Sequence, residues 1–217
     1  MHDSAPLYEH DRALLREASS PAFCIAGIDE AGRGPLAGPV VVAGVILPLE
    51  DEDSFFSVYD SKAVDAAARR ELFEALTHSP RIRYAIAERD SARIDEVNIL
   101  RATHEAMREV ALRLKPDLAL VDGLPVPAFP LPARFIVKGD ATSASIAAAS
   151  ILAKVHRDAL MEEYDKTYPG YGFAQHKGYG TRAHLDALRE LGPCPIHRLS
   201  FAPVREIVSP QLTFNFD

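Results

Sequence analysis

The chain has 217 residues, enough for one domain with a substantial hydrophobic core and a small appended piece. Its 24 basic and 31 acidic side chains give a formal net charge of −7, which argues mildly against a nucleic-acid partner, and its two cysteines imply no disulfide framework. No apolar run is long enough to cross a membrane and the first residues show no secretory pattern, so we expect a cytoplasmic protein.

The first half of the chain combines apolar strands with helices. We expect a short helix at 8–18, strands at 23–29, 39–48 and 81–88, and a helix at 66–76. From Ile94 to Leu114 the apolar residues recur at three- and four-residue steps, which predicts a single amphipathic helix ended by Lys115-Pro116. The short links between the first three strands favour antiparallel neighbours.

The second half alternates strands and helices. We expect strands at 118–121 and 134–137, joined by a proline-rich loop, and helices at 142–164 and 181–191. The longer helix has little polar bulk on any side at its start, which predicts tight packing in the core. The tail after Pro203 shows no clear pattern. This order of elements is typical of an α/β fold with a mixed sheet.

Four carboxylates share one local context. Asp29 (with Glu30), Asp122 and Asp140 each follow an apolar strand-like run and lie near a glycine. If these strands are neighbours in one sheet, their ends bring the four acids together, and mutual repulsion then calls for divalent cations. Oxygen ligands favour magnesium or manganese over zinc. Bound cations would offset part of the negative charge, so the net charge does not exclude a nucleic-acid substrate.

A glycine-rich loop follows the first acidic pair. Backbone N–H groups at Gly32-Arg33-Gly34 can approach a phosphate or sugar closely. A dinucleotide-binding turn is excluded, because the glycine spacing up to Gly38 is one residue too long and a strand, not a helix, follows. Cys194 and His197 have one Cys-x-x-His spacing without a second pair, so we expect them to pack and form hydrogen bonds.

Taken together, these motifs resemble the ribonuclease HII family of bacteria. The resemblance runs in order from about Ile25 to Phe201 and shows no departure at a catalytic position. It rests on the segments 28–40, Asp60-Ser61-Lys62, Val121-Asp122-Gly123, Val137-Lys138-Gly139-Asp140, 146–158, 168–173, 176–181 and 197–201.

The resemblance implies a ribonuclease H-like fold, with a mixed five-stranded sheet flanked by helices and a small helical C-terminal part. It implies an N-terminal extension at 1–20, a catalytic domain at 21–203 and a tail at 204–217. The implied activity is endonucleolytic: cleavage of the RNA strand of RNA–DNA hybrids and incision 5′ of single ribonucleotides in duplex DNA. The expected products carry 5′-phosphate and 3′-hydroxyl ends, and two Mn²⁺ or Mg²⁺ ions take part.

The resemblance also assigns roles to residues. Asp29, Glu30, Asp122 and Asp140 would be the catalytic metal ligands. Gly32, Arg33 and Gly34 would read the ribose 2′-hydroxyl, and Tyr179 would lie against the nucleotide at the RNA–DNA junction. Candidates for phosphate contacts are Lys138, Lys154, Lys177, Arg157 and Arg198.

Two other functions remain open at this point. One is a DNA nuclease of the same fold, and the other is a non-catalytic nucleic-acid binding module. We expect a monomer without membrane association. The segment 211–216 loosely resembles the short peptides that dock on replication sliding clamps, which makes such a clamp a further candidate partner.

Overall fold

The computed structural model describes residues 5–18, 20, 22–50 and 65–208. The motif Asp60-Ser61-Lys62 and the tail segment 211–216 therefore lie outside the described residues. The chain divides into two compact units. Unit 1 comprises Met1–Ala31, Val41–Glu88 and Thr103–His156, and unit 2 comprises Gly32–Val40, Arg89–Ala102 and Arg157–Asp217.

Unit 1 is built around a five-stranded sheet in the order β3-β2-β1-β4-β5. The strands are β1 (Ile25–Ala31), β2 (Val40–Ile46), β3 (Arg83–Arg89), β4 (Leu118–Asp122) and β5 (Ala133–Ile136). β1 pairs antiparallel with β2 and parallel with β4, and β4 pairs parallel with β5. The predicted mixed sheet is confirmed, and β1 is its central strand.

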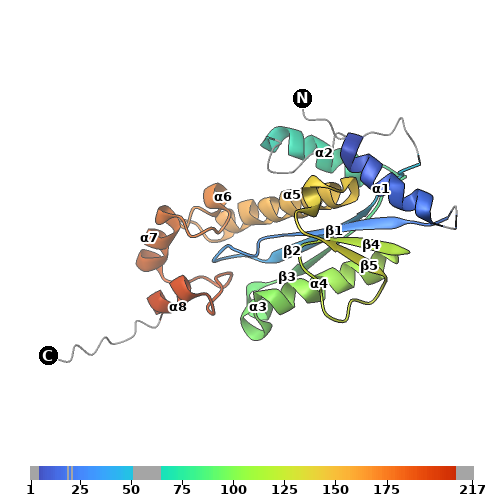
Figure 1. Ribbon diagram of the computed structural model, residues 1–217. Coiled ribbons are helices and arrows are strands. Elements are labelled where there is room, and N and C mark those ends of the chain that lie inside the picture. The colour runs from blue at the N-terminus through green and yellow to red at the C-terminus, as the bar shows by residue number, and fades with distance from the viewer. Residues whose placement is uncertain (1–4, 19, 21, 51–64, 209–217) are drawn as a thin grey trace. The chain divides into compact units, whose positions relative to one another are not determined.

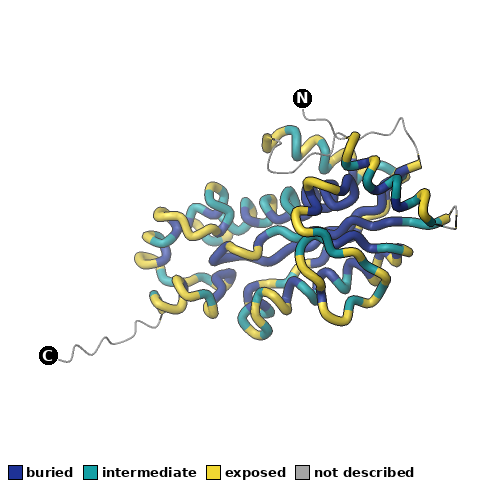
Figure 2. The backbone as a smooth tube through the Cα atoms, in the orientation of Figure 1, coloured by how far each residue is buried: buried dark blue, intermediate teal, exposed yellow. Residues whose placement is uncertain are grey.

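Helices cover both faces of this sheet (Figure 1). The N-terminal half of α5 (Ala144–Thr167) packs on one face, where a Cβ built on Gly27 would lie 2.0 Å from the Ser145 carbonyl carbon. Such an approach requires glycine in the strand and small residues in the helix, which explains the Ala- and Ser-rich start of α5. Residues of α4 (Ile99–Leu114), among them Val110, pack on the opposite face. Figure 2 shows β1 and β2 as buried along most of their length.

The N-terminal helix α1 (Ala5–Glu17) joins the core of unit 1 through a buried carboxylate. Asp11 Oδ2 accepts hydrogen bonds from the Ser143 hydroxyl at 3.0 Å and the Ser145 backbone N–H at 2.8 Å. Both donors lie at the start of α5, where backbone N–H groups have no partner within the helix. Asp11 thus caps α5 from another part of the chain. Among its described residues, unit 1 also contains α2 (Ala66–His78), which begins after its N-cap Asp65.

The prediction of a single helix from Ile94 to Leu114 is wrong. The structure has two helices in this region, α3 (Ser91–Val97) and α4, which are separated at Asn98. Asn98 has a φ of 72°, and its side-chain oxygen accepts a hydrogen bond from the Arg101 backbone N–H at 3.0 Å. The positive φ of Asn98 interrupts the helix, and its side chain caps the next one, although the apolar spacing continues across it.

The described residues of unit 2 form small helices around three apolar clusters. Its helices besides α3 are α6 (Phe173–His176), α7 (Arg182–Leu191) and α8 (Ala202–Val208), and the C-terminal part of α5 belongs to it as well. Neither α6 nor α8 follows from the sequence pattern. One cluster holds Tyr171, Phe173 and Ile196, and a second holds Leu36, Leu188 and Val204. The third holds Val40, Ile94 and Ala102.

Candidate functional site

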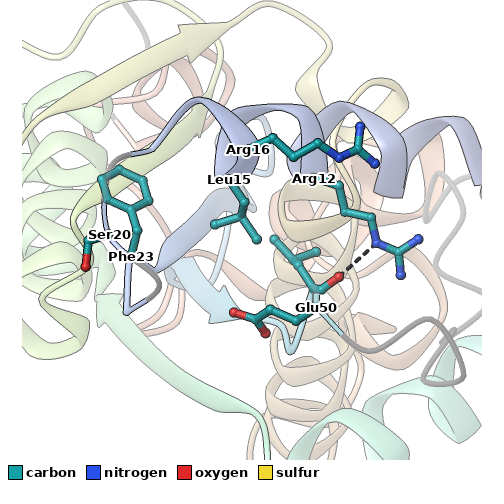
Figure 3. Close-up of a pocket in the computed structure, with 7 residues that line it drawn as sticks. Arg12, Leu15, Arg16, Ser20, Phe23 and Glu50 are labelled. Carbon is teal, nitrogen blue, oxygen red and sulfur yellow. Dashed lines mark hydrogen bonds between the residues drawn. The ribbon is translucent and has the colours of Figure 1, made fainter.

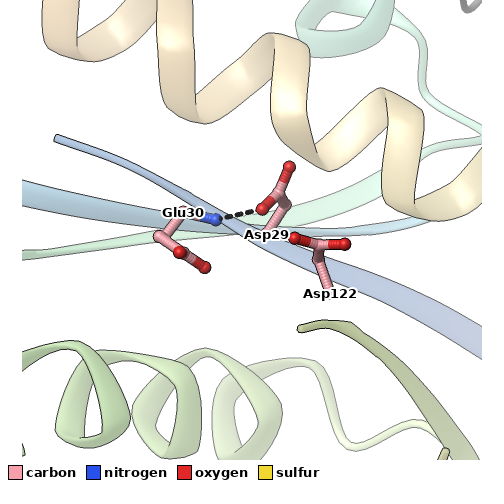
Figure 4. Close-up of side chains that lie close together, drawn as sticks. All are labelled: Asp29, Glu30 and Asp122. Atoms are coloured by element: carbon pink, nitrogen blue, oxygen red, sulfur yellow. Dashed lines mark hydrogen bonds between the residues drawn. The ribbon is translucent and has the colours of Figure 1, made fainter. Parts of the chain in front are cut away.

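The register of β1 and β4 places two of the predicted acids side by side in unit 1. Ile28 pairs with Val121 in the parallel ladder, so the next residue on each strand, Asp29 and Asp122, lies at the same edge of the sheet. Asp29, Glu30 and Asp122 each offer a carboxylate oxygen, and these oxygens all lie within 4.8 Å of one another. Figure 4 shows the three side chains grouped at this edge. We call them the carboxylate cluster.

Asp140 lies on the 3-10 helix η1 (Gly139–Ala141) and is buried, with 8% of its surface exposed. It is not part of the three-residue cluster, but its charge reaches Asp29, where it disfavours ionisation. The same turn also contacts Asp122 directly: the Gly139 backbone N–H donates to Asp122 Oδ1 at 2.6 Å. The segment that carries Asp140 is therefore attached to the cluster.

Burial and mutual repulsion dominate the electrostatics of the cluster. Desolvation raises the pKa of Asp29 well above its ordinary value, and the neighbouring charges of Glu30, Asp122 and Asp140 raise it further. A hydrogen bond from the Glu30 backbone N–H at 2.7 Å acts in the opposite direction. Carboxylates that cannot all ionise without a counter-charge, and that present only oxygen ligands, fit a hard divalent cation.

The glycine-rich loop and Tyr179 come together in unit 2. The Leu36 backbone N–H donates to the Gly178 carbonyl at 2.8 Å, which joins the loop to the segment that carries Tyr179. Gly34 is exposed and Tyr179 is 48% exposed, and a Cβ on Gly34 would lie 3.7 Å from Tyr179 Cε1. Gly32 differs from Gly34 in two ways: it is buried, and its backbone has a positive φ of +96°.

Arg157 and Arg198 do not serve as surface contacts for phosphates, so that prediction is wrong. Arg157 is 1% exposed and Arg198 is 0% exposed, and their guanidinium groups donate to backbone carbonyls of unit 2. Sequence reasoning treats an arginine as a surface charge by default, because its burial depends on acceptors supplied by distant segments.

The three lysines predicted to contact the substrate have different surroundings. Lys138 is exposed and adopts a left-handed conformation with a φ of 58° at the start of η1. Lys154 is half-buried on α5. The Lys177 ammonium forms an ion pair with Glu162 at 2.8 Å. Contact with substrate stays a prediction for all three.

A chain of histidines, not foreseen from the sequence, holds the Tyr179 segment. The Cys194 backbone N–H donates to His197 Nδ1 at 3.0 Å, so His197 carries its proton on Nε2 and donates to His184 Nε2 at 3.1 Å. His184 Nδ1 then donates to the Tyr179 carbonyl at 2.9 Å. The predicted packing and hydrogen bonding of Cys194 and His197 are confirmed.

A pocket of about 350 Å³ in unit 1 contains none of the predicted site residues (Figure 3). Its walls include Arg12, Arg16, Phe23 and Glu50, and Arg12 Nε donates to the Leu49 carbonyl at 2.8 Å. It shares no residue with the carboxylate cluster, so we do not assign the chemistry to it.

The family model for ribonuclease HII matches residues 26–204 of this chain. The chain belongs to the ribonuclease HII family. Ribonuclease HII of Geotalea daltonii is 49% identical over 212 residues, which cover 94% of this chain and 97% of that protein. Ribonuclease HII of Chlamydia caviae is 52% identical over 186 residues, which cover 85% and 86%. A chain in a solved structure of the PCNA:RNase HII complex from Archaeoglobus fulgidus is similar to this one, with a TM-score of 0.71 and 31% sequence identity. The match covers 82% of this chain and 95% of that chain.

Membership in the ribonuclease HII family establishes the class of activity. The chain is a ribonuclease H, an endonuclease that acts on the RNA strand of RNA–DNA hybrids with the help of divalent metal ions. The ribonuclease H-like fold expected from the sequence is confirmed. Within the described ranges, no helix combines the length and apolar character needed to cross a bilayer.

Proposed function

We propose that this ribonuclease H incises duplex DNA on the 5′ side of a single embedded ribonucleotide, besides cleaving long hybrids. The observation that supports the proposal is the pairing of Gly34 with an exposed Tyr179 ring in unit 2. A ribose differs from a deoxyribose only in its 2′-hydroxyl, which can both donate and accept a hydrogen bond. Backbone N–H groups in Gly32-Arg33-Gly34 can donate to it, and the two glycines carry no side chain that would obstruct its approach. The Tyr179 ring offers a flat apolar face to the adjoining sugar.

Asp29, Glu30, Asp122 and Asp140 are the proposed ligands of two Mg²⁺ or Mn²⁺ ions. The cluster of three acids, the buried Asp140 and the raised pKa of Asp29 support this assignment. When bound, such ions supply a water activated for attack on phosphorus and stabilise the charge on the leaving 3′-oxygen. The backbone donors at Glu30 and Gly139 hold Asp29 and Asp122 in place for that task.

The decisive experiment compares two DNA duplexes of the same sequence, one with a single ribonucleotide and one without, each with Mg²⁺ and with Mn²⁺. We expect cleavage of the first duplex alone, at the 5′ side of the ribonucleotide, with a 3′-hydroxyl on the upstream product. Equal cleavage of both duplexes would contradict the proposal and favour a DNA nuclease of the same fold. The relative rates in the two metals identify the preferred ion.

Binding to a sliding clamp through residues 211–216 is a further proposal. It is supported by the similarity to the RNase HII chain in the PCNA complex from Archaeoglobus fulgidus, and by the Gln, Leu and Phe residues of the tail. A pull-down with a purified clamp tests it, and an unchanged yield after deletion of residues 210–217 would contradict it. The monomeric state, the cytoplasmic location and the domain boundaries at 20/21 and 203/204 stay predictions.

A further inference from the structure

Arg198 holds the glycine-rich loop from within unit 2. Its guanidinium donates from Nη2 to the Gly32 carbonyl at 2.6 Å, from Nη1 to the Arg33 carbonyl at 3.0 Å, and from Nε and Nη2 to the Gly38 carbonyl at 3.0 and 2.8 Å. Two of the three acceptors belong to the proposed ribose-reading residues. The carbonyls of Gly32 and Arg33 are therefore directed at a buried cation, which fixes the direction of the peptide groups between Gly32 and Gly34.

Arg157 connects the same loop to the segment of Tyr179. Its Nε donates to the Pro39 carbonyl at 3.0 Å and its Nη2 to the Ala37 carbonyl at 3.1 Å. Its Nη1 donates to the Lys177 carbonyl at 3.0 Å, two residues before Tyr179. One rigid guanidinium thus joins both segments that flank the Gly34–Tyr179 pair.

Burying an arginine in this way costs free energy unless all the hydrogen bonds of its guanidinium group are formed. A buried guanidinium loses its hydration, and the loss is offset only when its N–H groups all find acceptors. Burial lowers the pKa of Arg198 to about 9, with a further contribution from the charge of Arg157, so the group is still protonated at neutral pH. Backbone carbonyls that accept these bonds cannot turn away without leaving a charged group unsatisfied.

We propose that Arg157 and Arg198 are positioning residues for ribose recognition. They hold 32–39 and 177–180 in one arrangement, with Gly34 beside Tyr179, before any substrate binds. This inference rests on the proposed role of Gly32-Arg33-Gly34 and Tyr179. It gives the two arginines a role in specificity through the loop, without contact to the nucleic acid.

The test uses Arg157→Lys and Arg198→Lys in the full-length protein. Lysine keeps the charge but cannot reproduce the planar fork that reaches several carbonyls at once. Arg182→Lys is the matched control, because Arg182 is exposed on α7 and pairs with Asp186. For each protein we measure kcat/KM on the duplex with one ribonucleotide, the inhibition constant of an all-DNA duplex added as competitor, and calorimetric binding of Mn²⁺ alone.

We expect both lysine variants to lose about tenfold or more in kcat/KM, comparable to the loss of one or two hydrogen bonds to a charged group. The competitor's inhibition constant and the affinity for Mn²⁺ should change less than about twofold, since neither measures contact with a 2′-hydroxyl. Wild-type kcat/KM in both variants, or an equal loss of kcat/KM and competitor binding, would overturn the inference.

Two further observations distinguish failure of this inference from failure of the proposed function and from failure of the variants to fold. If the wild-type protein cleaves without any dependence on the ribonucleotide, the proposed function fails rather than this inference. If the lysine variants do not fold, hydrogen exchange of the wild-type protein decides: the amides of Leu36 and Gly38 and the Nε–H of both arginines should be protected. Fast exchange at these groups would contradict a loop held in advance of substrate.

Discussion

Gly34 and Tyr179 lie close together: a Cβ on Gly34 would lie 3.7 Å from Tyr179 Cε1. This is ordinary van der Waals contact, and Gly34 does not have a positive φ. The fold itself therefore tolerates alanine at this position. A glycine that the fold does not require is best explained by what binds beside it.

Gly34→Ala should consequently separate folding from activity. We expect a melting temperature within about 2 °C of the wild type, because no backbone strain or clash arises. Cleavage of the duplex with one ribonucleotide should fall at least about tenfold, because the added methyl group occupies space beside the Tyr179 ring. Thermal unfolding and single-turnover kinetics measure the two effects, and wild-type cleavage would contradict the assignment.

Gly32→Ala is the contrasting substitution. Gly32 has a φ of +96°, and a Cβ there would lie 2.1 Å from Arg157 Nε and 2.8 Å from the Pro39 carbonyl oxygen. Alanine would combine backbone strain with a collision at a buried guanidinium, so we expect a loss of about 2 kcal/mol or more in the free energy of unfolding. Urea denaturation measures it. A stability equal to that of Gly34→Ala would argue against the described conformation.

Asp29→Asn tests the carboxylate cluster. Removing one buried acid relieves repulsion from Glu30 and Asp122, so the metal-free protein should unfold no more easily than the wild type. Cleavage in Mg²⁺ should fall by about a thousandfold or more, since a cation ligand is lost, while binding of the uncleaved duplex should be largely retained. Glu163→Gln, on the C-terminal part of α5, is the matched control for loss of one negative charge. Unchanged cleavage by Asp29→Asn would remove Asp29 from the mechanism.

The histidine chain predicts a loss of stability in acid. Burial, together with the neighbouring His184, lowers the pKa of His197 below its ordinary 6.5 to about 4. Between these two pH values the unfolded chain binds the proton more tightly than the folded one, so stability decreases as the pH falls from 6.5 to 4. The contribution is about 3 kcal/mol when complete. Protonation would add an N–H at His197 Nδ1, which would face the Cys194 backbone N–H that donates to this atom at 3.0 Å.

Urea denaturation at several pH values between 7 and 4.5 measures this loss. His197→Asn should show a shallower decrease of the unfolding free energy with falling pH than the wild type. His78→Asn is the control, because this side chain is 76% exposed on α2. An unchanged pH dependence in His197→Asn would show that the ring of His197 is not held neutral by the fold.

Asp11→Ala tests the contribution of the N-terminal helix. The substitution leaves the Ser143 hydroxyl and the Ser145 backbone N–H buried without their acceptor, which should lower the unfolding free energy by about 2 to 3 kcal/mol. Glu9→Ala, exposed on the same helix, should change the unfolding free energy far less than Asp11→Ala does. Equal effects would show that α1 does not stabilise α5. Asp11 precedes the segment 26–204 matched by the family model, so its role here follows from the structure alone.

Local patterns in the sequence were sufficient to predict much of the fold and of the candidate site. Strand ends at Asp29 and Asp122 are recognisable because an apolar run stops at an acid, and the parallel register then places those acids together. The break at Asn98 is not predicted, because the apolar spacing continues through it; its positive φ and its hydrogen bond with the Arg101 backbone N–H are seen only in the structure. The helices α6 and α8 are too short for a periodic signal.

Neighbouring residues in the chain were thus enough to reveal the acids, the glycine-rich loop and the strands that carry them, because side-chain chemistry and apolar spacing act over a few residues. The burial of Arg157 and Arg198 was beyond such reasoning. Their carbonyl acceptors lie between 20 and 166 positions away along the chain. Whether a charged side chain meets water, a phosphate or a carbonyl depends on which remote segments fold against it, and that arrangement exists only in the folded molecule.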